Sequence, residues 1–125
     1  MDEAIKIAVN ALNNRKATDI EILHVGDITT MAEYFVICSG SSSTQLRTLG
    51  DEVEYLLKEK LDLMPLHREG DPSSNWVLLD YGDFIVHVFH REARDFYKLE
   101  HLWADADRID PESLIEKEGE ENNEV

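Results

Sequence analysis

The feature that most constrains this sequence is a short apolar run, residues 34–38, that leads through a Ser- and Gly-rich loop into a long amphipathic segment. The run Tyr-Phe-Val-Ile-Cys is continuous and rich in β-forming residues, which is typical of a strand buried on both faces. Leucine and valine then recur at intervals of three and four from Leu46 to Leu61, which predicts a helix. A strand followed by such a helix predicts a sheet with helices packed on it.

Shorter patterned segments on both sides predict the rest of the fold. They are a helix over residues 3–13, a strand over 19–25, a short edge strand over 63–66, a hairpin of two strands over 75–80 and 83–89, and a helix over 91–103. The expected order is α-β-β-α-β-β-β-α, a mixed α/β (α+β) fold with a mixed sheet of about five strands flanked by helices. A chain of 125 residues fits one domain of this kind.

The charge balance limits the class of partner. The chain has 27 Asp and Glu against 12 Lys and Arg, a formal net charge of −15. Each contact to a phosphate backbone needs a positive side chain, so this excess of acid argues against direct nucleic-acid binding. A basic protein is the better partner. The alternative is that the acidity serves only solubility.

The end of the chain differs in composition from the rest. Residues 110–125 contain seven acids and one base, so we expect a domain over residues 1–107 and an acidic disordered tail over 108–125. Cys38 is the single cysteine and cannot form an internal disulfide. The start of the chain lacks the pattern of a secretory signal, and no apolar run reaches the length of a membrane helix. We therefore expect a soluble, cytoplasmic protein without membrane contact.

One corner of the sequence raises the possibility of an enzyme. A strand that ends in Gly40-Ser41 before a helix resembles the phosphate-binding corner of the nucleotidyltransferase superfamily. That superfamily also needs a pair of acids for magnesium, and Glu52 and Glu54 follow at a suitable distance. In a helix, however, residues two apart lie about 200° apart around the axis and cannot meet at one ion. Nucleotidyl transfer is an alternative that this spacing does not favour.

The histidines and the cysteine do not form a convincing reactive site. His87 and His90 are three residues apart on a predicted strand, where their side chains point to opposite faces. Cys38 lies inside an apolar strand, where a thiol is usually inert. We expect no metal ion, no cofactor and no catalytic residue.

Large side chains suited to protein contacts gather in the hairpin and in the last predicted helix. They are Trp76, Asp80, Tyr81, Asp83, Tyr97, Leu99, Leu102 and Trp103. Tryptophan and tyrosine are common anchors of protein interfaces, although an alternating strand buries one of its faces in any case. Together these residues predict a partner-binding surface. The same apolar residues could instead pair two copies of the chain in a homodimer.

Three stretches carry a family resemblance. Residues 32–42 (AEYFVICSGSS), 76–89 (WVLLDYGDFIVHVF) and 94–103 (RDFYKLEHLW) resemble the ribosomal silencing factor family, also called the Iojap-like family. The resemblance extends from the first helix to Trp103. Glu33 stands where an aspartate is expected, and the acidic tail is not part of the family pattern.

The resemblance implies a non-enzymatic factor with a nucleotidyltransferase-like fold. Such factors bind the large ribosomal subunit through ribosomal protein uL-fourteen, block its joining with the small subunit and lower translation when nutrients are short. Organellar relatives assist assembly of the large subunit, which is an alternative role here. On this chain, the eight residues named above would form the contact. Their aromatic and leucine side chains would be anchors, while Asp80 and Asp83 would pair with basic side chains.

Overall fold

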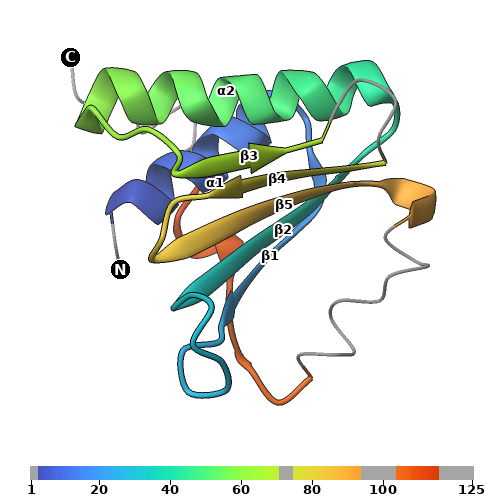
Figure 1. Cartoon of the computed structure of the whole chain (residues 1–125). Coiled ribbons are helices and arrows are strands. Elements are labelled where there is room, and N and C mark those ends of the chain that lie inside the picture. Colours follow the sequence, from blue (N-terminus) through green and yellow to red (C-terminus); the bar gives the residue numbers. More distant parts are fainter. Residues whose placement is uncertain (1–2, 71–74, 94–103, 116–125) are drawn as a thin grey trace.

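The chain forms one mixed sheet with helices packed on one face (Figure 1). The computed structural model describes residues 3–70, 75–93 and 104–115. Its elements are α1 (Glu3–Asn14), β1 (Thr18–His24), β2 (Tyr34–Gly40), α2 (Ser43–Leu61), β3 (His67–Glu69), β4 (Trp76–Asp80), β5 (Phe84–His90), β6 (Asp107–Ile109) and the short 3-10 helix η1 (Pro111–Ser113). None of the helices in these described ranges is both long and apolar enough to cross a bilayer.

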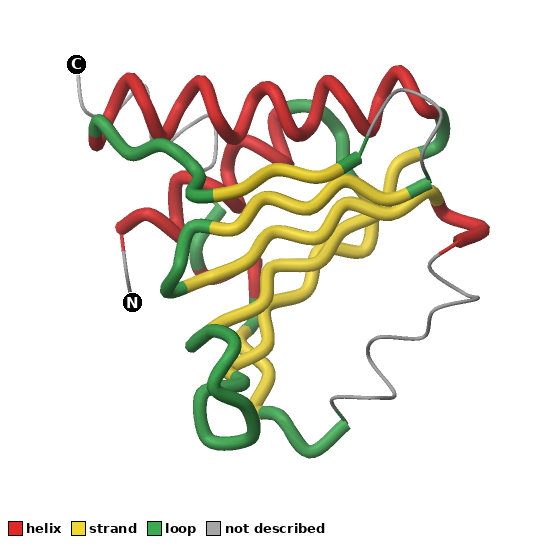
Figure 2. The backbone as a smooth tube through the Cα atoms, in the orientation of Figure 1, coloured by secondary structure: helices red, strands yellow, loops and turns green. Residues whose placement is uncertain are grey.

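The strands lie in the order β3-β4-β5-β2-β1-β6 (Figure 2). Strands β2 and β5 pair in parallel, whereas the other neighbouring pairs are antiparallel. Helix α2 makes the crossover that takes the chain from β2 to β3, and β4 and β5 form a hairpin. The predicted mixed α/β architecture is therefore confirmed, with six strands in place of about five.

The additional strand corrects the expected start of the tail. Residues 108–115 were expected to be disordered, yet β6 pairs with β1, and Ile22 lies opposite Ile109. Beyond β6, Asn10 Nδ2 donates a hydrogen bond to the backbone oxygen of Leu114 at 2.9 Å, and Ile115 packs against the core. A few apolar residues are enough here because β1 offers an open edge. Residues 116–125 lie outside the described residues.

The short edge strand also lies later than predicted. It was expected over residues 63–66, but β3 spans His67–Glu69. Pro65 has no backbone N–H to donate to a ladder, and Leu66 is the residue whose N–H reaches Asp80 O, at 2.7 Å. Strand pairing with β4 begins directly after this contact.

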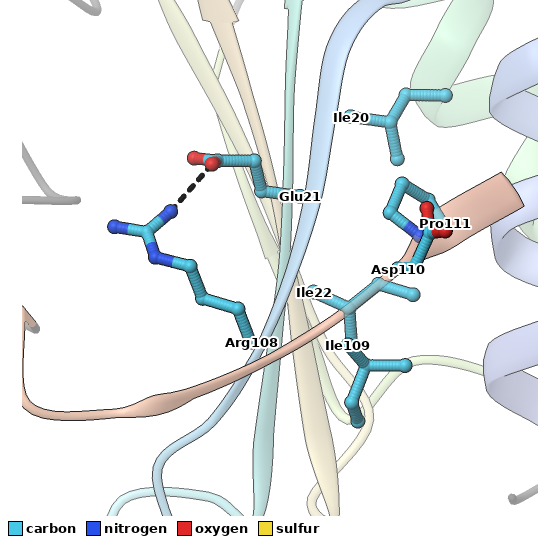
Figure 3. Close-up of a pocket in the computed structure, with 7 residues that line it drawn as sticks. All are labelled: Ile20, Glu21, Ile22, Arg108, Ile109, Asp110 and Pro111. Atoms are coloured by element: carbon cyan, nitrogen blue, oxygen red, sulfur yellow. Dashed lines mark hydrogen bonds and ion pairs between the residues drawn. The ribbon is translucent and has the colours of Figure 1, made fainter.

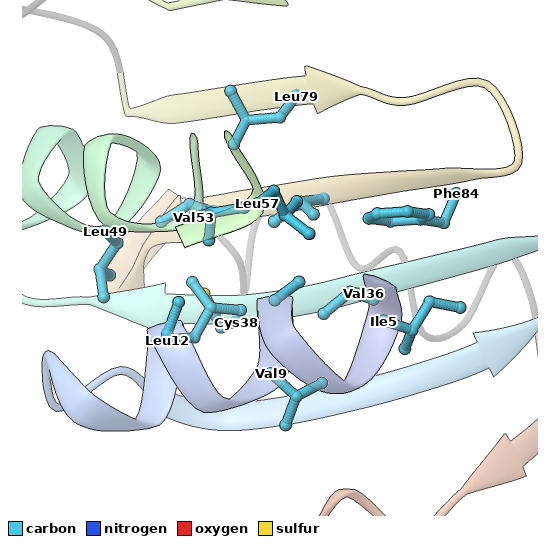
Figure 4. Packing of buried hydrophobic residues seen from close by; sticks show 14 of the residues in the cluster. Ile5, Val9, Leu12, Val36, Cys38, Leu49, Val53, Leu57, Leu79 and Phe84 are labelled. Atoms are coloured by element: carbon cyan, nitrogen blue, oxygen red, sulfur yellow. The ribbon is translucent and has the colours of Figure 1, made fainter. Parts of the chain in front are cut away.

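The larger part of the core lies between the sheet and the two helices (Figure 4). Helix α1 contributes Ile5, Val9 and Leu12, helix α2 contributes Leu49, Val53 and Leu57, and the sheet contributes Val36, Cys38, Leu79 and Phe84. Nearly all of these side chains are fully buried. Each contributes about 1.5–3 kcal/mol through removal from water, which holds both helices against this face of the sheet.

Candidate functional site

Strands β4 and β5 send alternate side chains to opposite faces of the sheet. Val77 and Leu79 face the helices and join the larger core cluster. Because side chains alternate along a strand, the other set faces away from the helices. We call this set the hairpin face; it consists of Trp76, Leu78, Asp80, Ile85, His87 and Phe89. The antiparallel register places Trp76 opposite Phe89, and Leu78 opposite His87.

The aromatic rings of the hairpin face stack on one another. The Trp76 ring lies 5.1 Å from Phe89 and 5.7 Å from His87, with interplanar angles of 24° and 28°. Phe35 of the neighbouring strand β2 meets His87 edge-on at 4.8 Å. His87 and Phe89 are buried, whereas Trp76 and Leu78 are only half-buried. The Trp76 side chain is therefore partly exposed and stacks on Phe89 and His87.

The turn of the hairpin carries two acids, at the other end of β4 from Trp76. Gly82 has a φ of 86°, a conformation that favours glycine, and its N–H donates to Asp80 Oδ1 at 2.8 Å. Asp80 is half-buried and Asp83 is exposed. The Asp83 backbone oxygen accepts hydrogen bonds from the N–H groups of Glu33 and Tyr34, at 2.8 and 3.1 Å. Hydrogen bonds thus fix the side chain of Asp80 within the turn and the backbone of Asp83 against β2.

Tyr81, one of the predicted contact residues, is buried in the structure. Its side chain is only 7% exposed and stacks on Phe84 with ring centroids 5.0 Å apart. Burial, aided by the negative charge of Glu54, raises the pKa of the Tyr81 phenol. The side chain belongs to the core cluster beneath the helices and is not an exposed anchor. Tyr81 continues the alternation of Val77 and Leu79 toward the helices, which residue type alone does not predict.

The remaining predicted contact residues lie beyond what the structure describes. The helix expected over residues 91–103 falls largely in 94–103, which is outside the described residues. This stretch includes Tyr97, Leu99, Leu102 and Trp103. The structure therefore places Trp76 and Asp80 on one face of β4 but at opposite ends of the strand, with Asp83 in the turn after Asp80, and leaves the other four as a prediction.

His87, which from the sequence was considered only as a metal ligand, is buried in the structure. It is 4% exposed, and its burial among rings lowers the pKa of its imidazole to about 4. His90, its expected partner, accepts a hydrogen bond from the Glu92 N–H through Nδ1, at 3.3 Å. Within the described ranges, no three His, Cys, Asp or Glu side chains lie together as a metal site would require. Side chains alternate between the two faces along β5. This alternation was the signal in the sequence that His87 lies on the same face as Trp76.

The buried imidazole predicts a pH dependence of stability. Its pKa is about 4 in the folded chain and about 6.5 when unfolded, so the unfolded state binds the proton first as the pH falls. We expect the free energy of unfolding to drop by about 3 kcal/mol more between pH 7 and pH 4 in this protein than in His87→Phe.

Urea titrations of both proteins across this range measure the difference, since the carboxylates common to both cancel. Below the folded pKa both states carry the proton, so the two curves should become parallel there. Curves that stay parallel from pH 7 to pH 4 would show that burial does not perturb His87.

The corner that resembles a phosphate site is occupied by the chain's own side chains. Ser42 caps α2, and its Oγ accepts the Gln45 N–H at 3.1 Å. Gln45 Oε1 accepts hydrogen bonds from both the N–H and the Oγ–H of Ser41, at 2.7 and 2.9 Å. The Ser41 amide that would face an anion is thus bonded to Gln45.

The two acids considered for magnesium point in different directions. Glu52 pairs with Arg15 at 3.2 Å, whereas Glu54 pairs with Arg68. Arg15 follows α1, while Arg68 belongs to β3, so the two carboxylates are drawn to different neighbours. This geometry agrees with the helical spacing argument, because residues two apart on a helix do not share a face.

A shallow cleft lies at the β1–β6 edge of the sheet, between β1 and the β6–η1 segment (Figure 3). It has a volume of about 330 Å³, and Ile20, Ile22, Ile109 and Pro111 supply most of its wall. At its rim, Arg108 pairs with Glu21. The charged groups are thus bonded to each other, and the cleft offers mainly apolar contact where β6 joins the sheet.

Comparison with known proteins places this chain in a family. The family model described as "Ribosomal silencing factor during starvation" matches residues 1–125. The chain is 37% identical over 114 residues to a ribosomal silencing factor of Halalkalibacterium halodurans, covering 90% of this chain and 96% of that protein. It is 39% identical to the Bacillus subtilis factor over 106 residues, covering 85% and 89% of the two chains.

Solved structures agree with this assignment. A crystal structure of a Chromobacterium violaceum protein is similar with a TM-score of 0.78 at 35% identity, and the match covers 83% of this chain and 88% of that one. The family model matches the whole sequence, the relatives are covered almost completely and the fold is shared. The chain therefore belongs to the ribosomal silencing factor family.

Proposed function

We propose that this protein binds the large ribosomal subunit through ribosomal protein uL-fourteen and blocks its joining with the small subunit. Translation would then fall when nutrients are limiting. Family membership supports a role in translation regulation. The protein would act by occupying a surface, as a non-catalytic factor without a cofactor.

The observation that carries the proposal is the partly exposed Trp76 at one end of β4, with Asp80 at the other end of the same face and Asp83 in the turn that follows. A partly exposed tryptophan that stacks on neighbouring rings is a common type of anchor at protein interfaces. Leu78 extends the apolar area next to it. The two acids offer charge pairs to a basic partner, and such pairs select the partner and speed encounter.

The distribution of charge supports a basic protein as the target. Several basic side chains in the described ranges are already paired with acids of the same chain: Arg15 with Glu52, Lys58 with Asp62, Arg68 with Asp51 and Glu54, and Arg108 with Glu21. With a formal charge of −15, the protein is repelled by ribosomal RNA phosphates. This repulsion leaves basic ribosomal protein surface as the favourable contact.

The four residues of the last predicted helix complete the proposed contact. Tyr97, Leu99, Leu102 and Trp103 would add apolar anchors to Trp76, Asp80 and Asp83 of the hairpin. Their part in binding is an expectation from the family resemblance, and single alanine substitutions in a binding assay would rank them against Trp76.

The test is light scattering of purified small and large subunits, mixed with and without this protein. A parallel sucrose gradient shows which subunit carries the protein. We expect slower and less complete joining, with the protein travelling with the large subunit. Unchanged joining, with the protein left at the top of the gradient, would contradict the proposal, and magnesium-dependent nucleotide turnover would then be the activity to test.

A further inference from the structure

His87 makes a specific contact with the anchor of the hairpin face. The Trp76 Nε1–H donates a hydrogen bond to His87 Nδ1 at 3.3 Å. The same two rings stack with centroids 5.7 Å apart. Phe35 meets His87 edge-on at 4.8 Å, and Phe89 lies parallel to it at 6.1 Å. His87 is therefore clamped between rings, and the Trp76 indole is held both by stacking and by a directional bond.

The bond determines which nitrogen of His87 carries the proton. An indole nitrogen is only a donor, so Nδ1 must present a lone pair and the proton of the neutral ring lies on Nε2. Burial keeps the imidazole neutral near pH 7, since it lowers the pKa to about 4. Within the described part of the chain, Nε2 is buried without a hydrogen-bond partner. A buried polar atom left in this state is costly, which indicates that the histidine serves a purpose other than core packing.

We propose that His87 is the positioning residue of the docking surface, which holds the Trp76 indole in its binding orientation through Nδ1. The inference rests on the proposed function, because it assigns the partner-binding role to Trp76. Ordering a rotamer-rich side chain on binding reduces affinity, and a side chain ordered in advance avoids this loss. For one tryptophan the gain in affinity is about 3- to 10-fold.

The test uses three variants that differ in whether an acceptor stands at the position of Nδ1. His87→Phe keeps an aromatic ring in the stack but removes the acceptor. His87→Asn loses the ring, yet its side-chain oxygen lies close to the position of Nδ1 and accepts a hydrogen bond. His87→Gln places its amide nearer the position of Nε2 and serves as the matched control.

Two measurements are made on each variant. The first is the indole N–H resonance of Trp76 in ¹⁵N-labelled protein, assigned by its disappearance in Trp76→Phe. The second is affinity for large ribosomal subunits by cosedimentation. We expect His87→Phe and His87→Gln to shift the indole resonance and to bind about 3- to 10-fold more weakly. His87→Asn is expected to restore both quantities towards those of the unchanged protein.

The two measurements separate the two proposals. An indole resonance unchanged in His87→Phe, or weaker binding that His87→Asn does not rescue, would overturn the role of His87. If the unchanged protein does not bind large subunits, the proposed function fails. In that case a shifted resonance in His87→Phe that returns in His87→Asn would still show that His87 positions Trp76. The backbone spectrum of each variant confirms that the domain is folded.

Discussion

Replacing Trp76 with alanine is expected to weaken binding to large ribosomal subunits by 30-fold or more, the effect of losing an interface anchor of about 2 kcal/mol. Trp76 is half-buried, and its inner side stacks on Phe89 and His87. The substitution removes the accessible ring but leaves the buried layer below it in place. Cosedimentation at increasing subunit concentration measures the loss of affinity. The variant should also no longer slow the joining of the two subunits.

The control for this variant is Tyr55→Ala. Tyr55 is also a large aromatic residue, is 60% exposed, and lies on α2 on the opposite side of the sheet. We expect its removal to leave binding within about twofold, as for residues outside a hot spot. If Trp76→Ala is folded and binds as tightly as the unchanged protein, or if Tyr55→Ala is equally defective, the hairpin face is not the binding surface.

Replacing Leu57 with alanine is expected to lower the free energy of unfolding by about 2–5 kcal/mol. Leu57 is fully buried between α2 and the sheet, so the shorter side chain loses apolar contact and leaves a cavity. This is a large fraction of the stability of an ordinary domain, about 5–15 kcal/mol. Urea unfolding at neutral pH, followed by circular dichroism, measures the change.

Leu61→Ala is the matched control because it makes the same chemical change in the same helix. Leu61 is 42% exposed and ends α2, so its truncation is expected to cost less than about 1 kcal/mol. Equal losses in the two variants would show that α2 does not pack on the sheet as described.

Much of the fold was predictable because local patterns and tertiary contacts agree. The 34–38 run became the central strand β2, and the leucine spacing after it became α2. The helical spacing of Glu52 and Glu54 also predicted that the two acids would not meet at one ion, and in the structure each pairs with a different arginine.

Other features depended on contacts that no local pattern contains. β6 lies in a stretch of acidic composition and exists because β1 has an open edge that pairs Ile22 with Ile109. β3 begins two residues after Pro65, where β4 provides its partner. These short strands have weak propensities of their own, so the neighbouring strand decides where they form.

The sequence by itself determined the order of elements from α1 to α2, the hairpin and the family, since periodicity and motif are local properties of the chain. It also placed Trp76 and Asp80 on one face of β4, because side chains alternate along a strand. Only the tertiary structure decided that Tyr81 is buried while Trp76 is half-buried, and that His87 accepts a hydrogen bond from Trp76. Burial and ring contacts depend on which strands and helices meet in space, and residue order specifies this only after the whole sheet has formed.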